Sequence, residues 1–191
     1  MSLQNDPPFA LGQTLGVSSA TDGTGWVGAI KQFPDVDPTT GAIRSNRLKT
    51  CIAVRNTSGV TLLPKRAVAF ADGSYSEVSG YTRLTNDVVA GVVDEFLSSS
   101  GVAANDVFWV TVDGPTELFV SQAVAVGNVV AAVTAHTTNS TSSAGTGGYG
   151  ATVSVTVAPQ VGRIGRVVSG TTNNVSILAN VVRICGVRRV A

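Results

Sequence analysis

The segment from residue 88 to residue 133 consists of short, valine-rich runs separated by turn residues. The runs are Val88 to Val93, Val107 to Val112, Leu118 to Val120 and Val129 to Val133. No helical period joins them, so the pattern predicts short strands. Asp113 and Gly114 are a hairpin signal between two of the runs, and Pro115 behind them favours a turn longer than two residues. The segment therefore predicts an antiparallel sheet that closes on itself.

The rest of the chain from residue 48 onward repeats this pattern. We expect further strands over residues 50–55, 60–63, 67–71, 151–157, 164–168, 175–178 and 181–187. Valine occurs 32 times and leucine 10 times, a bias toward residues that suit a pleated surface. The predicted fold class is all-β, a small antiparallel β-barrel or β-sandwich with an extended N-terminal arm.

The first 47 residues differ in composition from the rest of the chain. Glycine and proline interrupt them every few residues, which prevents a sustained apolar period. Large apolar side chains are nevertheless scattered among them, so we expect an extended arm that is ordered by packing against another molecule. The turn residues 37–41, between Val36 and Ile43, predict a small hairpin within the arm. The expected organisation is an arm at 1–47 and a barrel or sandwich at 48–191, with a polar surface loop at 136–150.

Charge is unevenly distributed, although the net charge is only +1. Residues 31–66 carry seven cations and two acids, and residues 67–135 carry eight acids and one arginine. Residues 136–191 carry five arginines and no acid. Two interpretations remain open: the basic parts fold back onto the acidic middle, or part of the charge faces another subunit. No basic run is dense enough to predict nucleic-acid binding.

The two cysteines and the apolar runs bear on the cellular compartment in which the protein is made. Cys51 and Cys185 form no disulfide framework and no metal-binding spacing, and both are expected to be free and partly buried. The longest nearly apolar run, residues 123–135, is too short to span a bilayer, and no signal-peptide pattern is visible at the N-terminus. We expect synthesis in a cytoplasm and no membrane partner.

No residue set predicts catalysis or a cofactor. Two G-x-G-x-x-G matches, at 23–28 and 145–150, lack the helix that a dinucleotide site needs. The single histidine, His136, cannot build a usual histidine-based zinc site, and no nucleophile motif accompanies it. Asp35 and Asp37 are followed by Thr39 and Thr40 rather than by the ligands of a calcium loop. The expectation is therefore a protein that is not an enzyme and binds no cofactor.

The core of the chain resembles the capsid decoration, or cement, proteins of tailed bacteriophages. The resemblance rests on VVAGVV at 88–93, VFWVTVDG at 107–114, VGNVVAAV at 126–133 and a late hairpin from Ile164 to Leu178, and covers roughly residues 50 to 180. It implies a non-enzymatic β protein on the outside of an assembled head. Such proteins are commonly trimers that bridge neighbouring major capsid subunits. The expected partners are thus the major capsid protein and further copies of this chain, and the expected location is the virion surface.

The arm is expected to supply the contacts with the shell and to be dispensable for folding of the barrel. The candidate partner-binding residues are its apolar side chains and the basic residues that follow: Phe9, Leu11, Trp26, Ile30, Phe33, Arg44, Arg47 and Lys49. Two alternatives remain: another virion structural role, in a tail or fibre, and a carbohydrate-binding β-sandwich. Against the second, only Trp26, Trp109 and three tyrosines are available to stack on sugars.

Overall fold

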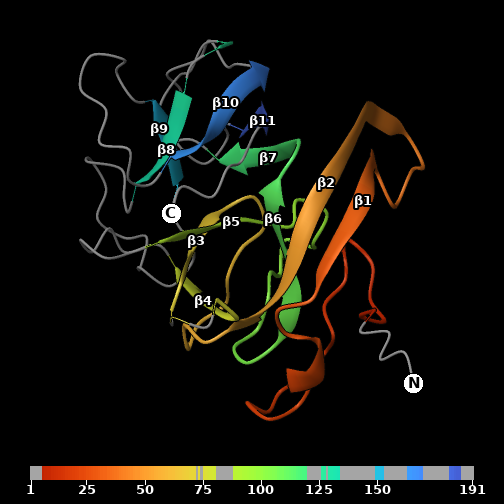
Figure 1. The fold of residues 1–191 in the computed structure, drawn as a ribbon, viewed down its shortest axis with the longest axis vertical. Helices are drawn as coiled ribbons and strands as arrows, with labels where there is room; N and C mark the ends of the chain where they lie inside the picture. Colours follow the sequence, from red (N-terminus) through yellow and green to blue (C-terminus); the bar gives the residue numbers. More distant parts are fainter. Residues whose placement is uncertain are drawn as a thin grey trace.

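The computed structural model describes residues 6–71, 73, 75–80, 88–119, 126–127, 129–133, 149–152, 163–169 and 181–185, with side chains through residue 127. The described chain forms two β-sheets, shown in Figure 1. Its only helical element in these ranges is a single 3-10 turn, Thr24–Trp26. The all-β prediction is therefore confirmed. Among the described residues, no helix is long and apolar enough to cross a membrane.

The first sheet has six strands in the order β1-β2-β4-β3-β5-β6. They are β1 (Ile30–Val36), β2 (Ile43–Asn56), β3 (Ala67–Phe70), β4 (Glu77–Gly80), β5 (Val89–Val93) and β6 (Val107–Asp113). β2 also pairs with β6, so the strands from β2 to β6 form a closed ring of pairings, with β1 attached to β2 outside it. The β2–β4 pair is parallel, which departs from the purely antiparallel prediction.

The interior of this ring is the main hydrophobic core. Side chains from all five ring strands meet there, together with residues of the connecting loops, and they are buried. The members are Ile52, Val54, Leu62, Val68, Phe70, Val78, Ala90, Val93, Leu97, Val102, Phe108 and Val110. Small β-branched side chains fit this narrow space because each presents little volume above the pleated backbone. The valines that line the ring interior are thus explained by the geometry of the ring.

Gly91 allows β5 to approach β6 closely. Its φ is +152°, and a Cβ placed there would lie 2.2 Å from the carbonyl oxygen of Thr111. A side chain at this position would therefore force the two strands apart, since no real Cβ approaches a backbone oxygen so closely. The glycine in the centre of VVAGVV is explained by this contact.

The second sheet has the order β7-β11-β10-β8-β9. Its strands are β7 (Thr116–Phe119), β8 (Val129–Val133), β9 (Tyr149–Thr152), β10 (Arg163–Ser169) and β11 (Val181–Cys185). The hairpin predicted around Asp113 and Gly114 is wrong, because β7 pairs with β11 and not with β6. The turn, in which Gly114 has φ +100°, instead carries the chain from the first sheet to the second. Residues 175–178, predicted as a strand, lie outside the described ranges.

The segment before β1 covers the outer surface of the ring. Phe9 and Leu11 are buried against Cys51, Ala53, Val107 and Trp109. The indole of Trp109 is fully buried, and its Nε1 donates a hydrogen bond to the carbonyl of Phe9 at 3.1 Å. This corrects the idea of an arm without partners in its own chain. The boundary at residue 47 is also wrong, because β2 runs through it without interruption.

The hairpin predicted within the first 47 residues is confirmed and is larger than expected. β1 and β2 pair in antiparallel register from Ile30–Ile52 to Val36–Ile43, with an irregularity after Pro34. In Figure 1 the two strands rise side by side, away from β4, to the turn at residues 37–42. The turn is closed by Asp37, whose carboxylate accepts hydrogen bonds from the amides of Thr39 and Thr40. These bonds lower the pKa of Asp37.

Candidate interaction surface

The β1–β2 hairpin has two faces of different chemistry. Side chains of directly paired residues point to the same side of a sheet, and successive residues alternate. One face therefore carries the pairs Ile30–Ile52, Gln32–Thr50, Pro34–Leu48 and Val36–Ile43. The other carries Lys31–Cys51 and Phe33–Lys49. The first face continues the apolar lining of the ring, while the second lies under the N-terminal segment.

The first face is apolar and exposed beyond the end of the ring. Ile52 belongs to the ring interior, whereas its partner Ile30 has 69% of its surface exposed. Further along the hairpin, Ile43 is 72% and Leu48 is 56% exposed. None of the paired positions on this face bears a charge. We call Ile30, Pro34, Val36, Ile43 and Leu48 the apolar hairpin face. The uncharged pair Gln32–Thr50 lies between Ile30 and Pro34, and Val36 is half-buried. Exposed apolar surface of this kind marks interaction sites.

The opposite face of the hairpin is fixed by buried charges. Lys49 is 1% exposed, and its Nζ pairs with the carboxylate of Glu95 and lies 3.5 Å from Asp35. Ser45 donates a hydrogen bond to Asp35 from the same strand as Lys49. Lys49 also lies 4.5 Å from the centre of the Phe96 ring. A buried lysine is tolerated here because carboxylates and an aromatic face replace the water it has lost.

The charged network continues to the second sheet. Arg44 lies 3.0 Å from Glu95 and also pairs with Glu117 of β7. Lys65 pairs with Glu117 at 2.7 Å, and the amide of Glu117 donates to Glu95 at 3.0 Å. The hairpin, the loop after β5 and β7 are therefore joined through shared carboxylates. Separating a buried ion pair leaves each charge without a partner and away from water, which is unfavourable. The network therefore resists movement of the hairpin and holds the apolar hairpin face in a fixed position.

These contacts decide between the two interpretations of the uneven charge for this part of the chain. The basic residues Arg44, Lys49 and Lys65 pair with Glu95 and Glu117 from the acidic middle of the sequence. Arg44 and Lys49 thus hold the hairpin in place and do not present free charge to a docking partner. Both were candidate partner-binding residues, and their charges are instead engaged within the chain. The arginines of β10 and β11 have no described side chains.

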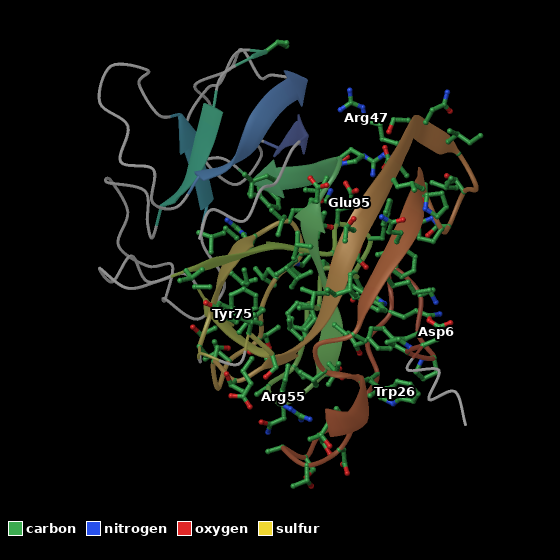
Figure 2. All side chains as sticks on the ribbon, in the orientation of Figure 1. Asp6, Trp26, Arg47, Arg55, Tyr75 and Glu95 are labelled. Carbon is green, nitrogen blue, oxygen red and sulfur yellow. The ribbon has the colours of Figure 1, made fainter. Side chains whose placement is uncertain are left out.

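The apolar residues predicted to bind a partner fall into two groups. Phe9 and Leu11 are buried, and Phe33 packs edge-on against Trp109 at 5.2 Å, so all three serve the protein's own core. Trp26, labelled in Figure 2, is half-buried. Ile30 is exposed. Arg47 is exposed near the end of the hairpin, as Figure 2 shows. Of the predicted set, the apolar hairpin face contains only Ile30.

Sequence reasoning missed Pro34, Val36, Ile43 and Leu48 as members of one surface. A signal for them existed: the turn at 37–41 predicts pairing of its two flanks. Extending this pairing along the two flanks of the turn, with side chains alternating between the faces, places these residues on one face. The irregularity after Pro34 was not visible in the sequence, and it is what returns Ile43 to the face of Leu48.

Two further features of the described residues bear on whether the chain could hold a metal ion or a small ligand. No group of three or more His, Cys, Asp or Glu side chains in the described ranges could hold a metal ion. A cavity of about 350 Å³ lies beside the charged network, lined by Leu63, Pro64, Lys65, Arg66, Glu95, Leu97, Ser99 and Phe119. Its ionisable groups already make contacts within the chain: Lys65 with Glu117, Glu95 with Lys49, and Arg66 over the Phe119 ring. His136 and most of the loop at 136–150 lie outside the described residues.

Comparisons with known proteins do not assign a family. No protein-family model matches the chain, and no curated protein matches its sequence. Among solved structures, the chain is similar to the N-terminal base of the head fiber protein gp8.5 of bacteriophage phi29. The match has 13% identity and a TM-score of 0.42, and covers 73% of this chain and 93% of that chain. A likeness this distant carries no argument about function.

Proposed function

We propose that the protein is a structural component of a phage virion. It binds the outside of the assembled head and bridges or stabilises major capsid protein subunits. It acts without catalysis and without a cofactor. The observation that carries this proposal is the apolar hairpin face, which is exposed and is held from behind by the buried charges of Lys49 and Glu95. The resemblance of the strand and glycine order to capsid decoration proteins supports the same conclusion.

The physical argument concerns pre-organisation. Binding is weakened when loops and side chains must be ordered on contact. The hairpin is already fixed by β-pairing and by the ion network, so little ordering is needed when its apolar face meets a partner. Many copies on one shell also act together, so modest affinity at each position is sufficient. A rigid, uncharged face of this kind suits lasting attachment to a protein surface.

A carbohydrate-binding role finds less support. Trp109, the larger of the possible sugar-stacking platforms in the barrel, is fully buried between Phe9 and Phe33. Tyr75 is exposed, but its ring already packs edge-on against Phe70 at 5.0 Å. Attachment to a tail or fibre would use the same kind of apolar contact as attachment to a head. The two roles are therefore distinguished by whether the protein binds isolated heads or isolated tails.

The test is co-sedimentation with assembled heads that lack the protein, with isolated tails as a second target. The variant replaces two exposed anchors, Ile43→Ser and Leu48→Ser. The matched control replaces two exposed valines elsewhere, Val60→Ser and Val88→Ser. Burial of such a side chain contributes roughly 1.5 to 3 kcal/mol. At about 1.4 kcal/mol per tenfold, the hairpin variant should therefore bind at least about 100-fold more weakly.

The control variant should bind heads like the wild type. Equal binding by both variants would remove the apolar hairpin face as the attachment site. Binding to tails but not to heads would favour the alternative virion role.

We also propose that the protein self-associates, with a trimer as the expected form. Light scattering at micromolar concentration tests this, and a clean monomer of 19.4 kDa would contradict assembly before attachment.

A further inference from the structure

β1 is an edge strand, and its main-chain groups alternate between β2 and the outside. The sheet order begins with β1, and within the described residues no strand or bridge pairs with its outer side (Figure 1). The amide of Ala53 donates to the carbonyl of Ala29 at 2.8 Å, so these two residues form a hydrogen-bonded pair. Such pairs recur at every second residue of an antiparallel ladder. The register therefore turns the main chain of Lys31 and Phe33 toward β2.

The outward main-chain positions of β1 are Ile30, Gln32 and Pro34. The side chains of all three are exposed. Ile30 and Gln32 each present an amide and a carbonyl to the outside, whereas Pro34 has no N–H and presents only a carbonyl. The strand becomes irregular directly after Pro34, which ends the regular edge. An edge of this kind, next to exposed apolar side chains, is a template for pairing with another chain.

A two-fold pairing centred on Gln32 would use all three outward positions. Gln32 of one copy would exchange two hydrogen bonds with Gln32 of the other, and Ile30 would lie opposite Pro34. The amide of Ile30 would donate to the carbonyl of Pro34, but the return bond has no donor. One bond is lost on each side of the two-fold axis, and the proline ring meets the Ile30 carbonyl instead. Pro34 therefore interrupts this register at both ends.

A two-fold pairing centred on Lys31 avoids Pro34 but meets a second obstacle. The two Lys31 side chains would lie directly opposite each other, and like charges in this position are destabilising. The ion pair between Lys31 and Asp6 is partly exposed, so it offsets only part of the repulsion. The pairing also cannot be extended, because Pro34 would next meet Gly28, which already donates its amide to β2. Each of the two registers is thus opposed by a residue of β1 itself.

We propose that Pro34 protects the β1 edge against pairing with a second copy of this chain. The same residue contributes apolar surface to the apolar hairpin face, so side-chain contacts through that face remain open while main-chain pairing at the edge is blocked. Proline suits this role because it removes a donor from the edge without removing a hydrogen bond to β2. The inference does not depend on attachment to a phage head.

The test introduces Pro34→Thr into the full-length protein. Threonine restores the outward amide and is less apolar than a larger aliphatic residue, so a gain in association is assigned to the edge. Sedimentation velocity over a range of protein concentrations measures self-association. The two regained hydrogen bonds should strengthen it roughly tenfold or more over the wild type. The amides of Ile30 and Gln32 should also become more protected from hydrogen exchange as the concentration of the variant rises.

Two further variants separate edge pairing from other effects. Pro38→Thr restores an amide in the exposed turn after β1, away from the edge, and should associate like the wild type. Gln32→Pro combined with Pro34→Thr moves the proline to another outward position of the same strand. No hydrogen bond to β2 is lost, and the central pair of the Gln32 register loses both donors. This double variant should also associate like the wild type.

Association of Pro34→Thr that does not exceed that of the wild type would overturn the proposal. An equal gain in Pro38→Thr would also overturn it, because the amide restored there does not lie on the β1 edge. If Pro34→Thr is recovered only as an aggregate, the double variant decides. A soluble double variant supports protection of the edge by proline, and an aggregated one contradicts it.

Discussion

Lys49 and Glu95 form an ion pair in which both side chains are only 1% exposed. The pair joins the middle of β2 to the loop after β5, 46 positions away in the sequence. On the opposite side of the hairpin, directly across from Pro34, lies Leu48, the neighbour of Lys49, with more than half of its surface exposed. One residue of β2 thus fixes the strand inside the protein, and the next presents an apolar side chain to the outside.

Lys49→Met should destabilise the protein strongly. It keeps the length of the side chain but leaves Asp35 and Glu95 without their shared cation, and breaking a buried pair costs about 3 to 5 kcal/mol. Lys31→Met is the control, because the Lys31–Asp6 pair is partly exposed and such pairs contribute about 1 kcal/mol or less. Urea unfolding at pH 7 measures both variants. A Lys49 variant as stable as the Lys31 variant would contradict the anchoring role of the network.

Ile30 and Ile52 are paired across β1 and β2 but should respond differently to truncation. Ile52→Ala removes volume from the ring interior and should cost about 2 to 5 kcal/mol. Ile30→Ala removes an exposed side chain and should change stability by no more than about 0.5 kcal/mol. Denaturant midpoints of the two variants give the comparison. If Ile30→Ala is as harmful as Ile52→Ala, the apolar hairpin face is covered by its own chain.

Gly91→Ala should prevent normal pairing of β5 with β6. The new Cβ would lie 2.2 Å from the Thr111 carbonyl in a backbone conformation that side chains rarely adopt, so the loss should exceed about 3 kcal/mol. Gly25→Ala is the control, since nothing lies within 4 Å of its added Cβ. Thermal unfolding by circular dichroism checks the pair. Similar melting temperatures for the two variants would show that the strands can separate without cost.

Phe9→Ala should destabilise the folded barrel rather than merely weaken attachment to a partner. Phe9 is 4% exposed, with its ring centre 4.9 Å from that of Trp109, and truncation of such a side chain costs about 3 to 5 kcal/mol. Ala10→Ser, at the exposed neighbouring position, should change stability by about 0.5 kcal/mol or less.

A chain starting near Arg47 should lose cooperative unfolding. Cooperative unfolding of that shortened chain would restore the idea of a dispensable arm.

Cys51 should not react with thiol reagents in the native protein at pH 8. Its side chain is fully buried, and burial raises the pKa of the thiol to about 12, so the reactive thiolate is scarce. Cys185→Ser removes the second cysteine of the chain, so every thiol titrated in this variant belongs to Cys51. Titration should find no fast thiol before denaturation and one thiol after it. Rapid native reaction would contradict the burial. In the wild-type protein, the absence of any titratable thiol after denaturation without reductant would reveal a disulfide.

The sequence by itself determined the class of the fold and several local features. Valine-rich runs between turn residues specify strands because β-branched side chains suit a pleated sheet and resist helix. The turn at 37–41 specified a hairpin because the carboxylate of Asp37 caps it locally. Each of these depends on interactions between residues that are near in sequence, so it can be inferred from a short stretch.

Tertiary structure decided which side chains are buried by other segments of the chain, and therefore which residues are exposed to a partner. Phe9 and Ile30 look alike in the sequence, as apolar residues in a segment rich in glycine and proline. Phe9 is buried because Trp109, a hundred positions away, packs against it and donates a hydrogen bond to its carbonyl. Ile30 is exposed because β1 lies outside the ring and pairs only with β2. Arg44 and Lys49 pair with acids whose proximity depends on the closed ring and on β7. These outcomes depend on contacts between distant segments, and neither composition nor alternation along one segment specifies such contacts.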